Sequence, residues 1–214
     1  GQDGTVKGTE FKRYSFRSNL DAQLKKWLKM GVNMTYSNTD ERLGLVDSDE
    51  GILNIALLST PDVPIYDMNG NYTSVSREGQ TRVNPIGKSL QEDNLLKRAS
   101  LNGNIFFDAT IMKGLVFHTE YAIDKGNSNA ERFYPTAKYG NWVRKINSDS
   151  WQANQNMFWQ VKNYLTYAKD LGLHKMTVML GQEMSESNYK YQSISNPNLP
   201  DNTVHNPNLG TDKP

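Results

Sequence analysis

The sequence predicts an all-β fold, namely an antiparallel segment of a transmembrane β-barrel with about six strands arranged in three hairpins. Three observations lead to this fold class. Polar and apolar residues alternate with a period of two, the alternating runs come in pairs, and short connections alternate with long ones. Barrels of bacterial outer membranes follow this plan, with short periplasmic turns and long extracellular loops.

The first hairpin is expected at about residues 13–37. One face of its first run carries apolar and aromatic side chains: Tyr14, Phe16, Leu20 and Ala22. The opposite face carries Arg13, Arg17, Asn19, Asp21 and Gln23. After a short link that ends at Trp27, the alternation resumes with Leu28, Met30, Val32, Met34 and Tyr36 on one side. Two such runs with a short link predict an antiparallel pair.

Two weaker copies of this unit follow at about 95–124 and 157–183. In the second hairpin the apolar positions are Leu101, Ile105, Phe107, Leu115, Phe117, Tyr121 and Ile123. In the third they are Trp159, Val161, Leu165, Tyr167, Met176, Val178 and Leu180. Each run is about as long as the 9–11 residues that a tilted strand needs to cross a bilayer.

The long connections are expected at 38–93, 125–150 and 184–214. Loops longer than about 12–15 residues are uncommon in compact domains, whereas external loops of barrels are often this long. The whole chain, 1–214, is therefore assigned to one barrel domain, and its two ends look like cut loops.

Composition excludes several other classes of protein. A mean hydropathy of -0.70 and the lack of any long apolar run exclude a transmembrane helix, which needs roughly 20 apolar residues. The 24 basic and 23 acidic residues form no basic cluster, so nucleic acid is not an expected partner. With no cysteine, disulfides, thiol catalysis and cysteine-based zinc sites are excluded.

The alternation also predicts which residues face lipid. Phe16, Leu20, Met30, Val32 and Phe117 are expected to face lipid, and Arg17, Asn19, Asn33 and Glu120 to face the lumen. Aromatic residues at the two strand ends are candidates for interfacial girdles: Tyr14, Tyr36 and Tyr121, and Trp27, Phe107 and Tyr167. Because even small barrels need about eight strands, this segment should form an open arc whose apolar face has no second sheet against it.

Several short motifs resemble one family. They are the run Gly8–Asp21 with Lys26-Trp27-Leu28-Lys29 and Gly31, then Pro64-Ile65-Tyr66-Asp67 with Asn69-Gly70-Asn71-Tyr72, Lys113-Gly114-Leu115, and Met179-Leu180-Gly181-Gln182-Glu183. In order and spacing they resemble SusC/RagA-like TonB-dependent transporters of the Bacteroidetes. That family forms a barrel of about 22 strands around a plug.

The resemblance implies a bacterial outer-membrane location and import of oligosaccharides or oligopeptides. It also implies several partners: TonB, a SusD-like surface lipoprotein, outer-membrane lipid, and the remaining barrel and plug of the same transporter. The plug domain, the TonB-contacting segment and the family's N-terminal extension are absent from this stretch. As it stands, the chain is not expected to transport anything.

No enzymatic constellation is apparent, and neither a cofactor nor a metal is expected. The three histidines, His118, His174 and His205, are far apart, and the common nucleophile, zinc and phosphate-loop motifs do not occur. Two acidic segments, Asp47–Gly51 and Asp67–Asn71, could supply oxygen ligands to calcium, but neither has the spacing of a calcium-binding loop. Asn69-Gly70 between two tyrosines favours a hairpin turn.

Aromatic residues in and beside the long loops are the remaining candidates for binding. They are Tyr66, Tyr72, Tyr134, Tyr139, Trp142 and Trp151. Tyr66, Tyr72, Tyr139 and Trp142 are taken as candidate substrate-binding residues, since flat rings stack on sugars and peptide side chains. The alternative is that these rings pack the loops together. The run Gly51–Leu58 is expected to form a helix that stops before Pro61.

Two other functions stay open. A passive porin would share the pattern of strands and loops, and its gene would lack a plug domain. A secreted carbohydrate-binding β-sandwich would bury the same apolar faces in a core and would be soluble without detergent.

Overall fold

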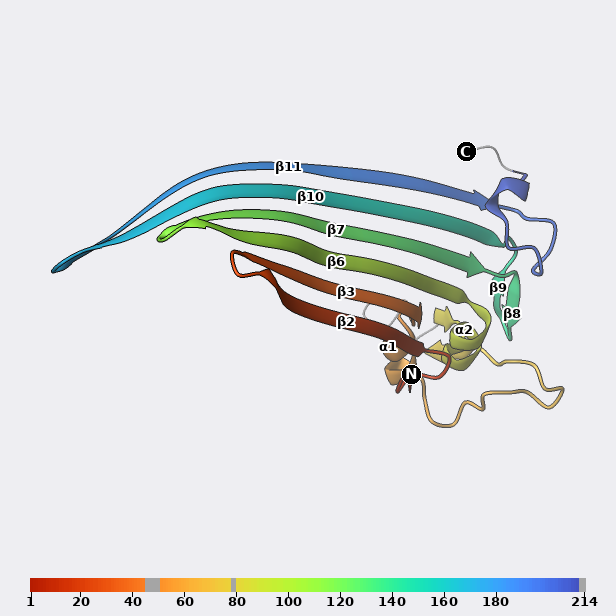
Figure 1. Ribbon diagram of the computed structural model, residues 1–214. Coiled ribbons are helices and arrows are strands. Elements are labelled where there is room, and N and C mark those ends of the chain that lie inside the picture. Colours follow the sequence, from red (N-terminus) through yellow and green to blue (C-terminus); the bar gives the residue numbers. More distant parts are fainter. Residues whose placement is uncertain (45–50, 78–79, 212–214) are drawn as a thin grey trace.

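The computed structural model describes residues 1–44, 51–77 and 80–211. Seven of its strands form one antiparallel sheet in the order β1-β2-β3-β6-β7-β10-β11. Their bounds are β1 Gln2–Asp3, β2 Glu10–Lys25, β3 Leu28–Arg42, β6 Asp93–Met112, β7 Leu115–Tyr134, β10 Ser148–Leu171 and β11 His174–Pro197. Figure 1 shows β2, β3, β6, β7, β10 and β11 side by side in a single curved layer. The open antiparallel sheet confirms the predicted fold class.

The six long strands form three hairpins with tight turns. The turns lie at Lys26–Trp27, Lys113–Gly114 and Gly172–Leu173. Gly114 has a φ of +83° and Gly172 one of +69°, a backbone region that glycine adopts without steric cost. A Cβ atom on Gly114 would lie 2.2 Å from the carbonyl oxygen of Ala168. The second turn therefore requires glycine both for its conformation and for its contact with β10.

The strands run further than the sequence predicts. Residues 125–134, 148–150 and 184–197 were expected in loops, but they belong to β7, β10 and β11. The expected loop at 38–93 likewise begins within β3, which ends at Arg42. In these stretches both faces of the sheet carry polar residues, so the alternation of polar and apolar residues is lost. The backbone ladder continues regardless, because each strand still pairs with its neighbours.

The register of the sheet separates an apolar face from a polar face. One row of directly paired residues is wholly apolar or aromatic: Leu20, Val32, Ile105, Tyr121, Val161 and Met184. Phe16, Leu20 and Val178 are 57%, 53% and 54% exposed, and Met30, Val32 and Phe117 are half-buried. None of these six side chains is buried in a core between two sheets. The predicted arc is therefore observed, with the amendment that the two-residue strand β1 pairs with the start of β2.

The turns are staggered along the strand direction. Leu28, Ala109, Phe117 and Leu165 are successive partners across the sheet and so mark one level. The first turn is directly next to Leu28, whereas Lys113 lies four residues beyond Ala109 and Gly172 lies seven beyond Leu165. The turn of each hairpin thus lies about 10 Å further along the strand direction than the turn of the hairpin before it. Across the sheet, successive hairpins are two strands apart, which is also about 10 Å. The resulting slope of about 45° is that of tilted strands in a transmembrane barrel.

The apolar surface shifts in the same direction. The row of paired residues that begins with Phe16 and Tyr36 on the first hairpin ends at Asn188 on β11. The next apolar residue of β11 on this face is Met184, four residues nearer the turn. An apolar belt that lies oblique to the strands is expected when the strands cross a flat bilayer at a tilt.

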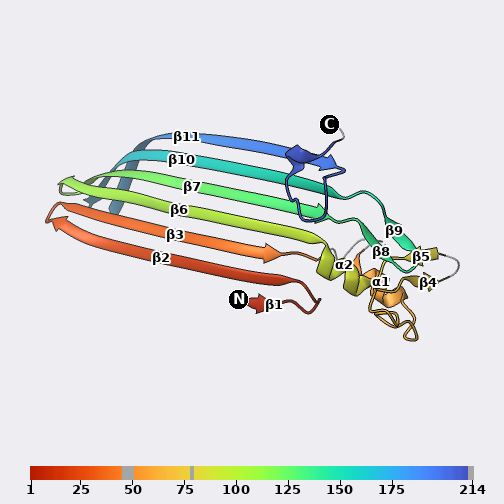
Figure 2. The same ribbon diagram turned by 90° about the vertical axis from the view of Figure 1, so that its right-hand side faces the viewer.

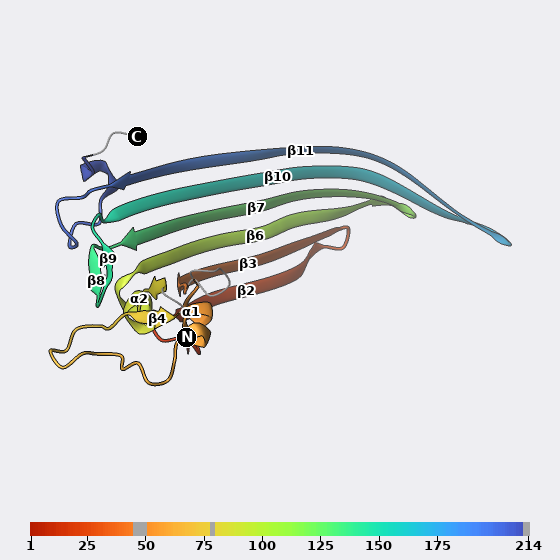
Figure 3. The same ribbon diagram turned by 180° about the vertical axis from the view of Figure 1, so that it is seen from behind.

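The remaining elements gather at the end opposite the turns, as Figures 2 and 3 show. They are α1 Ile52–Leu58, β4 Val75–Arg77, β5 Gln80–Arg82, α2 Pro85–Gln91, β8 Ala137–Tyr139, β9 Trp142–Arg144 and the 3₁₀ helix η1 Pro207–Leu209. The helix expected before Pro61 is confirmed as α1. In contrast, α2 was not predicted, although Asn84 caps it through Ile86 and Gly87 and Pro85 is its first residue. Neither helix is long and apolar enough to span a membrane.

Candidate functional site

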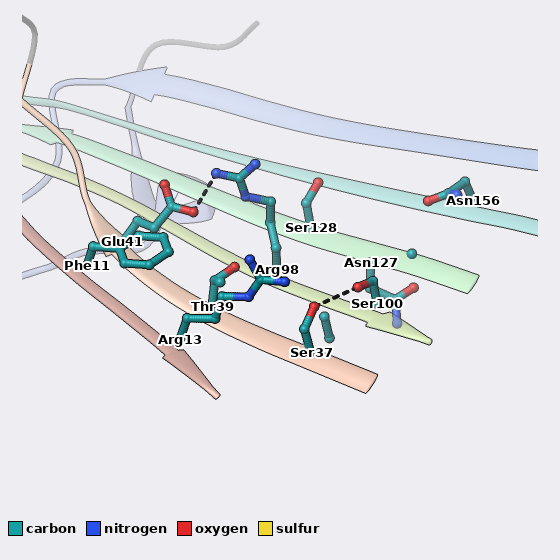
Figure 4. Close-up of a pocket in the computed structure, with 12 residues that line it drawn as sticks. Phe11, Arg13, Ser37, Thr39, Glu41, Arg98, Ser100, Asn127, Ser128 and Asn156 are labelled. Atoms are coloured by element: carbon teal, nitrogen blue, oxygen red, sulfur yellow. Dashed lines mark hydrogen bonds and ion pairs between the residues drawn. The ribbon is translucent and has the colours of Figure 1, made fainter. Parts of the chain in front are cut away.

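The polar face of the sheet is hollowed near the loop end by a groove of about 460 Å³. We call it the upper groove, and its walls include Phe11, Arg13, Ser37, Glu41, Arg98 and Ser128. Figure 4 shows their side chains over β2, β3, β6 and β7. Arg98 forms an ion pair with Glu41, and the hydroxyl oxygens of Ser37 and Ser100 are 2.8 Å apart. Contacts between neighbouring strands therefore hold this surface in shape before any ligand arrives.

A second groove of about 380 Å³ lies nearer the turns and is called the lower groove. Arg17, Asn19, Asn33 and Glu120, the four residues expected to face the lumen, all line it together with Asn104 and Asp124. Asn33 Nδ2 donates a hydrogen bond of 2.9 Å to Asn104 Oδ1. The two grooves make the polar face a continuous wall of amides, hydroxyls and charges.

His118 lies on the polar face toward the turns and is 8% exposed. Its Nδ1 atom is 2.6 Å from Asp108 Oδ1, and its ring stacks against Tyr164 at 4.3 Å and Phe106 at 5.6 Å between centroids. His174 begins β11 and His205 follows it in the chain by about thirty residues, so the structure does not assemble the three histidines into one site.

The candidate aromatic residues meet in the loop cluster, which consists of α1, α2, β4, β5, β8, β9 and the Tyr66–Tyr72 hairpin. Tyr72 lies 4.9 Å from Tyr66 and 5.7 Å from Tyr139, and Tyr139 lies 5.3 Å from Trp142, measured between ring centroids. Tyr139 packs with Ile55 and Val83 in a buried core and is only 1% exposed. These contacts favour the alternative in which the rings pack the loops together.

Tyr139 is tied into this core by its hydroxyl as well as its ring. The hydroxyl donates to Gln91 Oε1 at 2.7 Å, and burial, with a smaller effect of Glu92, raises the pKa of Tyr139 to about 12. A Cβ atom on Gly87 would approach this ring to 2.6 Å, so the ring needs glycine at that position. The face of Tyr139 is consequently closed to a ligand in this arrangement.

The other loop aromatics differ in their exposure. Tyr66 is 48% exposed and Trp142 is half-buried, so these two rings keep accessible surface. Tyr134 stacks with the guanidinium of Arg144 at 5.2 Å. Trp151 pairs with Glu131 and Ile194 on the apolar side of the sheet, away from the others. Use of Tyr66, Tyr72, Tyr139 and Trp142 in substrate binding stays a prediction.

Asp67 stabilises the turn of the Tyr66–Tyr72 hairpin. Its Oδ1 accepts the backbone N–H groups of Asn69 and Asn71 at 2.8 and 2.9 Å, and Gly70 has a φ of +79°. These hydrogen bonds lower the pKa of Asp67. The other calcium candidate, Asp47–Gly51, lies outside the described residues except for Gly51. Within the ranges that the structure covers, no group of three or more metal-binding side chains is present.

A strap formed by residues 198–211 folds over the apolar side of the strand ends at the loop end. His205 stacks on Phe133 with ring centroids 3.9 Å apart, and Asn196 Nδ2 donates to the carbonyl oxygen of Pro207 at 2.6 Å. Beneath the strap, Asp149 is 1% exposed and neither of its carboxylate oxygens has a hydrogen-bond partner among the described residues. Burial, and next the charge of Glu131, raise the pKa of Asp149.

The upper groove could not be predicted from the sequence. Arg13 was placed on the polar face of its strand, but Arg98 lay in a run whose alternation is weak. The register of β3 against β6 is what brings Arg98 next to Thr39, and that register cannot be read from a single strand.

No family model matches the chain. TonB-dependent receptor P26 of Formosa agariphila is 29% identical over 191 residues, which cover 84% of this chain and 18% of that protein. TonB-dependent receptor P3 of the same organism is 25% identical over 202 residues, covering 91% of this chain and 19% of that protein. The chain therefore spans about a fifth of the length of the curated relatives it matches.

The solved structures that match share the fold. The RagAB peptide importer in its open-open state superposes with a TM-score of 0.77 and 18% identity over 96% of this chain and 23% of that chain. The RagAB peptide transporter gives the same TM-score with 19% identity. The resemblance drawn from the motifs is confirmed: the chain is similar in sequence to TonB-dependent receptors, and its sheet has the fold of part of the β-barrel in the RagAB structures.

Proposed function

We propose that the chain forms part of the barrel wall and the external vestibule of an outer-membrane, TonB-dependent nutrient importer. The observation that carries this proposal is the asymmetry of the tilted sheet. Its apolar face is exposed along an oblique belt, whereas its polar face is grooved. Lipid on one side and an aqueous lumen on the other account for both faces.

In this proposal the short turns are periplasmic and the loop cluster is extracellular. The importer takes up oligosaccharides or oligopeptides, a SusD-like lipoprotein covers the external side, and TonB supplies energy through parts of the receptor outside this chain. The RagAB neighbours are a peptide importer and a peptide transporter, which supports the oligopeptide option for this chain. The wall residues bind and guide the substrate and perform no covalent chemistry.

Cysteine labelling of the full-length receptor tests the topology. The chain has no cysteine of its own, so single substitutions report their own position once cysteines elsewhere in the receptor are replaced. On intact cells, Asn71→Cys in the loop cluster should react with a membrane-impermeant maleimide. Lys25→Cys, next to the first turn, should react only after the outer membrane is opened. The reverse pattern would invert the topology and refute the external vestibule.

A second experiment separates an energised importer from a passive porin. Cells that express the full-length receptor are given a mixture of casein peptides and pectin oligogalacturonides, and uptake is followed by mass spectrometry with and without the gene for TonB. Uptake of at least one class should stop without TonB. Equal uptake in both strains would favour the porin.

A further inference from the structure

The upper groove carries a different charge from the lower groove on the same wall. Arg13, Arg98 and Glu41 are the ionisable residues of the upper groove, which gives it a formal charge of +1. Arg17, Glu120 and Asp124 are those of the lower groove, which gives it −1. The two grooves therefore differ in the sign of their formal charge.

Within the upper groove the positive charge belongs to Arg13. The charge of Arg98 is balanced by Glu41, because the Glu41 side chain is paired with Arg98 and is only 9% exposed. Arg13 has no carboxylate partner among residues 1–44, 51–77 and 80–211, and it is exposed on the groove side of β2. Figure 4 shows its guanidinium beside Thr39, near the ion pair of Arg98 and Glu41.

The surroundings of Arg13 suit an oxyanion. A guanidinium presents a planar fork of N–H groups that matches a carboxylate with two parallel hydrogen bonds. Ser37, Ser100 and Ser128 add hydroxyl donors across the groove, and Phe11, which is 39% exposed, adds an apolar flank. An anion held here would also be repelled by the acidic lower groove, so it would stay near the loop end.

We propose that the upper groove is a binding site for a carboxylate-bearing segment of the imported oligomer, with Arg13 as its main ligand. This inference rests on the proposed function and deepens it by naming the charge class of the substrate. A carboxylate can come from a uronic acid of an oligosaccharide or from an acidic side chain of a peptide. The site recognises the chemistry that both share.

The test measures binding to the purified full-length receptor in detergent by isothermal titration calorimetry. Four probes are used: trigalacturonate, its methyl ester, triglutamate and triglutamine. At least one acidic probe should bind more tightly than its neutral counterpart. Arg13→Gln should weaken binding of that probe by about tenfold, as expected for loss of a charged hydrogen-bond donor, and added salt should weaken it in the unaltered receptor.

The matched control is Lys12→Gln. It removes the same charge one residue away, but Lys12 lies on the opposite face of β2, where it pairs with Glu10. The affinity of the Lys12→Gln receptor for the acidic probe should equal that of the unaltered receptor. Arg98→Gln is made only together with Glu41→Gln, because the single change would leave Glu41 as an unpaired carboxylate in the groove.

The pattern across probes identifies the source of the carboxylate. Preference for trigalacturonate points to an acidic glycan, and preference for triglutamate points to an acidic peptide. The inference is overturned if neither acidic probe binds better than its neutral counterpart, or if Arg13→Gln and Lys12→Gln weaken binding equally. Either result leaves the proposed importer intact, since that proposal fails only on the cysteine labelling or on uptake that is independent of TonB.

Discussion

The sheet and the loop cluster place their apolar side chains in opposite ways. On the sheet, Leu180 and Phe16 are 76% and 57% exposed, whereas Ile55 and Tyr139 in the loop cluster are 2% and 1% exposed. A chain in water buries such residues, as the loop cluster does. A strand in lipid gains little by burying them, because lipid tails are themselves apolar. The difference is the one that the proposed importer requires, with lipid against the apolar face of the sheet and water around the loop cluster.

Removing the centre of the loop core should have the largest effect. Tyr139→Ala deletes a ring that contacts Tyr72 and Trp142 and should destabilise the loop cluster by about 3–5 kcal/mol. Limited proteolysis of the full-length receptor should show faster cleavage in the loops while the barrel stays resistant. Tyr66→Ala is the control and should cost much less, because its ring is half exposed. Equal effects would mean that Tyr139 is not the centre of a core.

Charge on the apolar face should have the next largest effect. Leu20 and Val32 face each other across β2 and β3, and Leu20→Arg or Val32→Arg should cost about 2–4 kcal/mol near the bilayer midplane. Asn19→Arg, one residue away on the grooved face, should cost much less. Urea unfolding of the receptor in lipid vesicles measures both. Similar losses on the two faces would contradict the assignment of one face to lipid.

The strap should respond to pH through Asp149, which lies at the loop end of β10, away from the apolar belt. Because folding raises the pKa of Asp149, its favourable contribution is present at low pH and is lost as pH rises through the folded pKa. Asp149→Asn removes a charge that is costly to bury, so it should stabilise the strap at neutral pH relative to the unaltered receptor. The variant should also lose this part of the pH dependence.

Hydrogen exchange of residues 198–211 between pH 5 and pH 8 measures this effect. Glu131 and His205 act on the Asp149 carboxylate in opposite directions, so the unaltered receptor and the variant are compared with each other at every pH. Faster exchange in the variant at pH 8 would show that the Asp149 carboxylate has a stabilising partner.

The apolar parts of the fold could be predicted because each carries a local pattern. The three hairpins follow from alternation in the stretches that have one apolar face, α1 from an apolar run before Pro61, and the Tyr66–Tyr72 turn from Asn69-Gly70. The outer halves of β7, β10 and β11 could not be predicted this way. Both of their faces carry polar residues, so pairing with the neighbouring strands is what makes them strands.

The candidate site was predictable in part for the same reason. Arg17, Asn19 and Asn33 alternate with apolar residues, so their face could be assigned from the sequence, and they line the lower groove. The loop aromatics could be named but not placed. Whether Tyr139 binds a ligand or fills a core depends on Ile55 and Val83, which lie more than fifty residues away in the chain.

The sequence by itself determined that this chain pairs strands in hairpins, which face of each hairpin is apolar, and which family it resembles, because these properties depend on residues close together in the chain. Only the tertiary structure decided how far the strands extend, how they stagger, that Arg13 and Arg98 share a groove, and that Asp149 lies beneath the strap. Those properties depend on register between strands. Register arises from backbone hydrogen bonds and packing between segments that are distant in sequence.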